Sequence, residues 1–310
     1  MKGYFTICIG VALLAAAGCG AIRFGEYQPP GSGGPGRVTL LFSGDSRGVT
    51  EPVRECACYE KPVAALGGLP RRASFVRGVR QLEDGVLLLD AGNTVVDPEE
   101  ADAERAQPRR VASALGAMGY DAVALGPAEL LAGAGGDAAW VEALGAPLVA
   151  ANLRGTALPE HQTSVTKVVG GVRVAVLGAA TPSAIPAPIQ ARLDLRVDPV
   201  ADVLAKQVSQ LDAVDLVVVL LQGTFQEARE LASALSGVDV IITGRSTGLL
   251  YASARVGSTL VVPALPEGKH VGRLRLEVHG RGRSTVLADE RIALDDRYPD
   301  DPVVRGLVGG

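Results

Sequence analysis

Continuous apolar runs alternate along this chain with segments whose apolar residues recur every three or four positions. Short Val, Leu and Ile runs are typical of strands buried on both faces, and the three-to-four spacing is typical of amphipathic helices. The strand-like runs are 38–42, 86–89, 121–125, 147–151, 172–177, 216–221 and 238–242. The helix-like segments are 71–82, 109–118, 137–144, 200–211 and 226–235. This alternation predicts an α/β domain with buried sheets.

The C-terminal part of the chain changes character. Residues 260–292 contain strand-like stretches at 271–278 and 284–288 without a helical pattern. From Asp295 the chain is acidic and interrupted by proline, so we expect a poorly ordered tail over 295–310. The folded domain is therefore expected to span 37–294.

The first residues indicate a targeting signal rather than a folded element. Lys2 precedes an apolar run at 4–17, which is short for a membrane span and fits a signal peptide. The small residues directly before Cys19 resemble the lipobox of bacterial lipoproteins, in which the cysteine is acylated and becomes the mature N-terminus. The alternative is an ordinary secretory signal with an incidental cysteine.

The lipobox resemblance implies a signal peptide at 1–18 and a membrane-bound protein anchored through Cys19. Gly20 follows the cysteine, and the usual sorting preference then implies the outer membrane, with the protein facing the periplasm. Residues 19–36 would form a flexible tether, because 27–36 (YQPPGSGGPG) has too little apolar content to fold. We therefore expect a bacterial cell-envelope protein.

The composition of the 310 residues excludes some partners. A net charge of −4 provides no basic field for nucleic acid. Aromatic residues make up 4% of the chain, which argues against base-stacking or carbohydrate platforms.

Five glycine-flanked segments follow strand-like runs, at 44–48, 90–93, 125–129, 220–223 and 244–247. In an α/β sheet, ligands bind at the carboxyl ends of the strands, where loops gather around exposed backbone amides. Position alone makes site candidates of Asp45, Asn93, Gln222 and Arg245.

The order of these segments resembles the metallophosphatase domain of the 5'-nucleotidase and UDP-sugar hydrolase family, a branch of the calcineurin-like phosphoesterases. The resemblance covers roughly 38–276. Residues 67–72 (GGLPRR) resemble the family's GGLAR turn, 87–92 (LLLDAG) its LLLDAGD motif, and 115–125 its NALGYDAVTLG run. It implies a four-layer α/β/β/α sandwich of two mixed sheets. Because little chain follows Leu276, the second domain of many such nucleotidases is expected to be missing.

The family would use two divalent metals, Mn, Zn or Mg, and its ligand positions are largely replaced here. Asp45 is kept as the one residual metal ligand, whereas the following His is Arg47 and the bridging Asp is Asn93. The Asn-His pair falls at Pro127 and Ala128. The remaining His positions carry Gln222 and, in the closing motif, Arg245 with Thr247. Paired dications need several anionic or imidazole ligands, so we expect no cofactor and identify no catalytic residue.

The replaced positions leave two interpretations of the cleft. Arg47 and Arg245, with Asn93, Gln222 and Thr247 as neutral donors, would suit a small anion or phosphate-containing ligand. Alternatively, the two arginines pair with Asp45 and Glu129 and fill a defunct cleft. The corresponding function is a non-catalytic binding or scaffold protein, whose partner is such an anion or an envelope protein. The alternative function is an active metal-dependent phosphohydrolase with an altered site.

Cys56 and Cys58 support a third function class. A C-x-C pair closes only a small, strained, redox-labile disulfide ring, and its thiolates are also ligands for a soft metal. In an oxidising compartment, a stabilising disulfide is the plain interpretation. A thiol-redox or metal-handling protein that uses Cys56 and Cys58 is therefore the second alternative function.

Overall fold

The strand-like runs form two six-stranded mixed sheets in the computed structural model, which describes residues 35–54, 65–96, 107–134, 139–246 and 252–309. The first sheet has the order β16-β15-β1-β4-β5-β6 and the second β13-β14-β12-β11-β9-β8. In the first sheet, β1, β4, β5 and β6 run parallel, whereas β15 and β16 pair antiparallel. In the second, β9, β11, β12 and β14 run parallel, whereas β8 and β13 are antiparallel.

The described elements have the following bounds. The first sheet contains β1 (Gly36–Ser43), β4 (Val86–Asp90), β5 (Ala122–Ala124), β6 (Leu148–Val149), β15 (His270–Val278) and β16 (Ser284–Ala293). The second contains β8 (Ser164–Val169), β9 (Val172–Ala180), β11 (Leu216–Thr224), β12 (Val240–Arg245), β13 (Ala254–Val256) and β14 (Thr259–Pro263). Two short pairs join β2 (Pro52–Val53) to β3 (Leu66–Gly67) and β7 (Leu153–Arg154) to β10 (Arg196–Val197). The helices are α1 (Leu69–Leu82), α2 (Pro108–Met118), α3 (Pro127–Ala134), α4 (Ala139–Leu144), α5 (Ala187–Arg192), α6 (Val200–Ser209), α7 (Phe225–Ala234) and α8 (Pro302–Val308).

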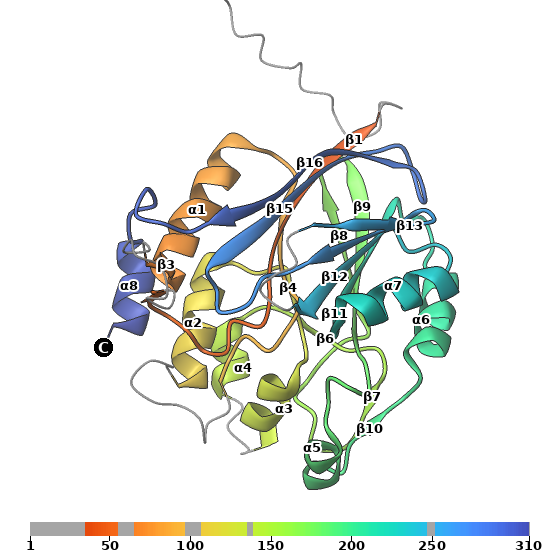
Figure 1. Ribbon diagram of the computed structural model, residues 1–310, viewed down its shortest axis with the longest axis horizontal. Coiled ribbons are helices and arrows are strands. Elements are labelled where there is room, and N and C mark those ends of the chain that lie inside the picture. The colour runs from red at the N-terminus through yellow and green to blue at the C-terminus, as the bar shows by residue number, and fades with distance from the viewer. Residues whose placement is uncertain (1–34, 55–64, 97–106, 135–138, 247–251, 310) are drawn as a thin grey trace, which may run out of the picture. The chain divides into compact units, whose positions relative to one another are not determined.

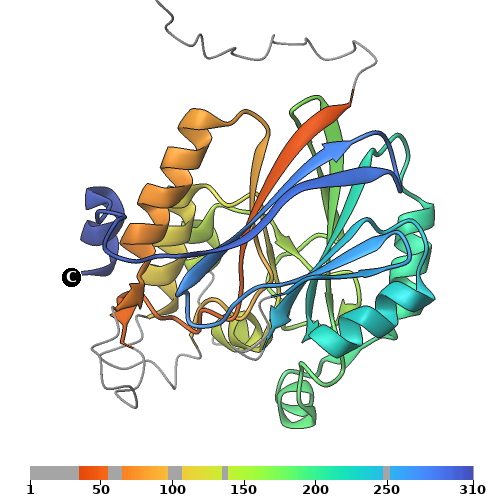
Figure 2. The same ribbon diagram turned by 45° about the horizontal axis from the view of Figure 1, so that its top comes forward.

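Each buried strand contributes to two hydrophobic layers because successive side chains point to opposite faces of a sheet. In β1, Leu40 and Phe42 belong to the core between the sheets, whereas Leu41 packs toward the helices. In β11, Val218 lies in the central core and Val219 faces the α6–α7 side. Figures 1 and 2 show α1, α2 and α8 on one side of the sheets and α6 and α7 on the other. The predicted four-layer α/β/β/α sandwich is confirmed.

The expectation of a poorly ordered tail after Asp295 is wrong for residues 302–308, which form α8. Asp301 caps this helix by accepting hydrogen bonds from the amides of Val303 (2.9 Å) and Val304 (3.0 Å), and it pairs with Arg77 of α1. Val304 and Val308 are buried in the core shared with α1 and α2. Asp301, one of the acidic residues behind the expectation of a poorly ordered tail, is the helix cap. Seven residues show too few turns for periodicity to reveal a helix.

No helix among the described residues is long and apolar enough to cross a membrane.

Candidate functional site

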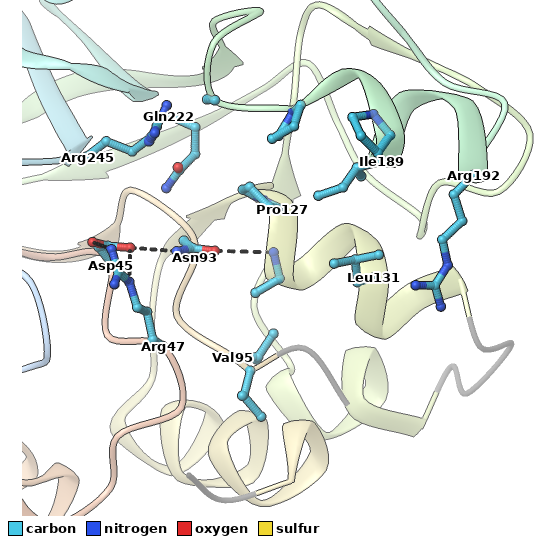
Figure 3. Close-up of a pocket in the computed structure, with 15 residues that line it drawn as sticks. Asp45, Arg47, Asn93, Val95, Pro127, Leu131, Ile189, Arg192, Gln222 and Arg245 are labelled. Atoms are coloured by element: carbon cyan, nitrogen blue, oxygen red, sulfur yellow. Dashed lines mark hydrogen bonds and ion pairs between the residues drawn. The ribbon is translucent and has the colours of Figure 1, made fainter. Parts of the chain in front are cut away.

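A cleft of about 540 Å³ opens where strands of both sheets end on the same side of the molecule (Figure 3). The predicted residues Asp45, Arg47, Asn93, Gln222 and Arg245 all line it. Thr247, Cys19, Cys56 and Cys58 lie outside the described residues, so their predicted roles stay predictions. The tertiary structure thus brings together the predicted site residues that it describes.

The loops after β1 and β4 are joined residue by residue at the floor of the cleft. The amide of Asp45 donates to the Gly92 carbonyl (2.8 Å), and that of Arg47 donates to the Asn93 carbonyl (3.0 Å). Asp45, Arg47 and Asn93 have φ values of 52°, 50° and 57°, in the left-handed region that non-glycine residues rarely adopt. Such conformations persist only where the surroundings over-determine them, and they cluster at functional sites.

Asp45 is held by two neighbours on the cleft floor. Arg47 donates from Nε to Asp45 Oδ1 (3.0 Å) and from Nη2 to Oδ2 (2.8 Å), a two-pronged ion pair. Asn93 Nδ2 also donates to Oδ1 (2.5 Å). The Asp45 side chain is 4% exposed and the Arg47 side chain 55%, so the carboxylate is buried beneath a guanidinium that reaches solvent. Both oxygens of Asp45 are therefore engaged.

Glu129 lies beneath the floor and serves as an internal anchor. Its carboxylate accepts backbone hydrogen bonds from Asn93 (2.7 Å), Thr94 (2.8 Å), Val95 (3.1 Å) and Gly126 (2.9 Å). Burial raises its pKa above the ordinary value, and the backbone donors oppose this shift. Glu129 therefore fixes the loop that carries Asn93, and the expected pairing between Arg245 and Glu129 does not occur.

Asp90, at the end of β4, supports the same loop from below. It accepts hydrogen bonds from Ser43 Oγ (2.5 Å), from the amide of Gly92 (2.8 Å) and from the hydroxyl of Thr94. Burial raises the pKa of Asp90, while these bonds and the charge of buried Arg72 lower it. Because Asp90 is directed into this buried network, it supports the site and does not line the cleft.

Gln222 extends from β11 and packs closely against three glycines. A Cβ atom would lie 2.4 Å from Gln222 Nε2 if added at Gly244, 2.9 Å from Nε2 at Gly92, and 3.1 Å from Cδ at Gly126. Nε2 donates to the Ala91 carbonyl (2.5 Å). These close approaches fix the amide head group at the meeting point of the two sheets.

Arg245 stands at the end of β12, on the strand next to Gln222. Its Nη1 donates to the Ser183 carbonyl (2.8 Å) and lies 3.3 Å from Ser183 Oγ. The expected ion pair with a carboxylate is therefore replaced by a neutral backbone contact. Figure 3 shows Arg245 and Gln222 together along one edge of the cleft, with Asp45 and Asn93 across from them.

On the far wall of the cleft, the sequence identifies Pro127 and Ala128 as replaced ligand positions but not the other lining residues. This wall comes from α3, α5 and the loop after β4, and its lining side chains are mainly apolar. The apolar residues are Val95, Val96, Pro127, Ala128, Leu131, Ala184, Pro186, Pro188 and Ile189, and Arg192 lies at the end of α5. Residues 186–192 contain two prolines and no extended periodic pattern, so no local signal marks them as a wall.

The residues at the cleft floor do not fit a pair of divalent metals. Two dications about 3.5–4 Å apart repel each other by roughly 17 kcal/mol at an effective dielectric constant near 20. Several anionic or imidazole ligands are needed to offset this repulsion. The cleft instead offers Asp45, which is already neutralised by Arg47, and two amides. Among the described residues, no cluster of three His, Cys, Asp or Glu side chains has the arrangement of a metal site.

Comparisons with known proteins agree with the family and the fold predicted from motif order. The chain is similar to the 5'-nucleotidase of Bos taurus, with 25% identity over an alignment of 310 residues that covers 87% of this chain and 52% of that protein. It spans about half the length of the curated relatives it matches. No family model matches the chain.

Solved structures show the same relationship. The 5'-nucleotidase precursor from Thermus thermophilus superimposes with a TM-score of 0.69 at 25% identity, covering 87% of this chain and 57% of that chain. A calcineurin-like phosphoesterase from Bacillus subtilis has a TM-score of 0.63 at 19% identity, covering 88% and 96%. The second similarity supports the fold alone.

Proposed function

We propose that this chain, a homologue of the 5'-nucleotidases with the calcineurin-like metallophosphoesterase fold, is a non-catalytic protein that binds an anion in its cleft. One observation carries the proposal. Arg47 covers both oxygens of Asp45, the one carboxylate among the described residues that line the cleft. A dication at this position must displace a guanidinium and then find further ligands that the described cleft does not provide.

Positive charge at the rim of the cleft supports anion binding. Arg47, Arg192 and Arg245 line it, whereas Asp45 is the only described acidic residue that does. Arg47 pairs with Asp45, whereas Arg245 donates to the neutral atoms of Ser183, so Arg245 supplies a positive charge that favours an anionic ligand without a metal. A guanidinium presents a planar array of donors that matches carboxylate and phosphate oxygens.

Metal retention is the first test of this function. The purified full chain is exposed to manganese and zinc, desalted, and analysed for bound metal next to an Asp45→Asn variant. We expect no difference between the two proteins, and no hydrolysis of AMP by either. Two equivalents of metal in the wild type that are lost in Asp45→Asn, together with AMP hydrolysis, would refute the proposal.

Anion binding is the second test, with inorganic phosphate as the probe. We expect saturable phosphate binding that weakens about tenfold or more in Arg245→Gln, because a charge-assisted contact contributes about 1.5–3 kcal/mol. Arg229→Gln on the exposed face of α7 is the matched control, since it removes the same charge away from the cleft. Equal phosphate binding by Arg245→Gln and wild type would remove Arg245 from the site.

We further propose that Cys19 anchors the protein in the bacterial envelope, because the residues before it resemble a lipobox. Metabolic labelling with a palmitate analogue tests this. We expect label in the wild type and in Cys8→Ser, and none in Cys19→Ser. Label that persists in Cys19→Ser would exclude this cysteine as the anchor.

A further inference from the structure

Gln222 carries a buried acceptor that has no hydrogen-bond partner among the described residues. Its side chain is fully buried, its Oε1 is unpartnered, and the residue lines the cleft. The orientation of the amide is determined by Ala91, whose carbonyl accepts from Nε2 at 2.5 Å. The reversed amide would place two oxygens at that distance. An unpartnered buried oxygen is unfavourable unless a donor reaches it, so the site is suited to a ligand that brings an O–H or N–H group.

Arg245 provides the charge next to this acceptor. It lies on β12, which pairs with the strand that carries Gln222, and both side chains line the same cleft (Figure 3). Its contact with Ser183 uses Nη1. The guanidinium has five N–H donors, so its other nitrogens remain available for an anionic oxygen. A ligand that satisfies both residues has a hydrogen-bond donor close to its anionic group.

The opposite wall of the cleft indicates what kind of carbon skeleton the ligand has. Val95, Leu131 and Ile189 line the cleft with aliphatic side chains and are drawn on the other side of Pro127 from Gln222 in Figure 3. No aromatic residue is among the described residues that line it, so the described part of this wall offers no platform on which a nucleobase can stack. The cleft has the size of small-molecule sites, and its apolar wall favours a short aliphatic chain.

We propose that the cleft selects a small aliphatic anion with a hydroxyl beside its charged group, such as a branched 2-hydroxycarboxylate, over a nucleotide. The carboxylate is bound by Arg245, the hydroxyl donates to Gln222 Oε1, and the aliphatic chain packs against Leu131 and Ile189. This assignment rests on the anion-binding function proposed above and names the class of ligand.

Calorimetric titration of the full chain with matched probes tests the assignment. The probes are 2-hydroxy-4-methylpentanoate, 4-methylpentanoate (the same skeleton without the hydroxyl), AMP and inorganic phosphate. We expect the hydroxy acid to bind about tenfold more tightly than the deoxy acid, because only the former supplies a donor to the buried oxygen. We also expect it to bind more tightly than AMP and phosphate.

Two variants separate the roles of the two polar residues. Gln222→Met keeps a side chain of similar length without the acceptor, so the preference for the hydroxy acid should disappear. Arg245→Gln should weaken the binding of both acids by about tenfold or more, whereas Arg229→Gln should leave both affinities unchanged. The comparison of the two acids on the wild type does not depend on the folding of any variant.

Equal affinity for the two acids, or no saturable binding of the hydroxy acid, would overturn the ligand assignment. If AMP or phosphate binds more tightly than the hydroxy acid, the assignment fails while anion binding stands. If the wild type retains two metals and hydrolyses AMP, the non-catalytic function itself fails. These outcomes distinguish the two proposals.

Discussion

Gly244 is the position at which one methyl group should disturb the site most. A Cβ atom there would lie 2.4 Å from Gln222 Nε2 and 2.5 Å from the Ala91 carbonyl oxygen. The φ of Gly244 is outside the left-handed region, so Gly244→Ala introduces a steric conflict without backbone strain. Because the Ala91 oxygen belongs to the backbone, the Gln222 amide must move and lose its hydrogen bond to that oxygen.

The expected loss of stability follows from three terms. Overpacking in a dense core costs about 1–3 kcal/mol. The lost hydrogen bond costs about 0.5–1.5 kcal/mol. Alanine also reduces the conformational entropy of the unfolded chain, which stabilises the folded state by about 0.4–1 kcal/mol. The free energy of unfolding should therefore fall by roughly 2–3 kcal/mol, and the melting temperature by roughly 4–6 °C for a domain of this size.

Thermal and urea denaturation of the full chain measure this effect, and Gly78→Ala is the matched control. Gly78 lies within α1, and a Cβ atom there would meet nothing within 4 Å. That variant should be stabilised by up to about 1 kcal/mol because alanine favours helix over glycine. A Gly244→Ala protein that melts at the wild-type temperature, or a Gly78→Ala protein that loses as much stability, would refute the packing argument.

Three further substitutions test single contacts. Arg47→Gln leaves buried Asp45 without its cation. Because Arg47 is half-exposed and water screens the pair, we expect the free energy of unfolding to fall by about 1–2 kcal/mol rather than the 3–5 kcal/mol of a buried pair. An unchanged urea midpoint would contradict this. Folded Glu129 has a pKa raised above 4.5 by burial, so between the unfolded and folded pKa the folded state retains a proton that the unfolded state has lost. The stability that this group contributes is present below pH 4.5 and is lost as the pH rises through the folded pKa. The difference in the free energy of unfolding between the wild type and Glu129→Gln should therefore narrow as the pH rises. A difference that stays constant with pH would exclude the raised pKa of Glu129. Asp301→Ala removes the cap of α8 and should cost about 1 kcal/mol or more, with faster hydrogen exchange confined to 302–308; unchanged exchange there would show that the cap is dispensable.

Long periodic elements could be predicted from local pattern, and short ones could not. The strand at 38–42 and the helix at 71–82 appear as β1 and α1 within two residues of the predicted bounds. The helix α5, with six residues and a proline at its start, and the cap at Asp301 were missed. Short elements contain too few turns to display a period, and packing against the rest of the domain stabilises them.

Some features of the site could likewise be predicted from local sequence, whereas others depend on contacts between residues far apart in the chain. Position after strand ends was sufficient to identify Asp45, Asn93, Gln222 and Arg245 as cleft residues, because parallel strands end on one side of their sheet. One interpretation open from the sequence was that Arg47 and Arg245 pair with Asp45 and Glu129, and the structure shows only the first of these pairs. Arg245 contacts Ser183 instead of Glu129, and no sequence motif marks that contact.

The sequence by itself determined the alternation of buried strands and amphipathic helices and the place of the cleft, because apolar periodicity and glycine-flanked strand ends are local signals. The four-layer arrangement was implied by the family resemblance and not by periodicity. Only the tertiary structure decided which polar atoms in the cleft are satisfied. The side-chain amide nitrogen of Gln222 finds its partner 131 residues away, at the Ala91 carbonyl, and the buried amide oxygen has no partner in the described chain. This hydrogen bond forms because the two sheets meet at their strand ends. No short segment of the chain carries a pattern that predicts that geometry.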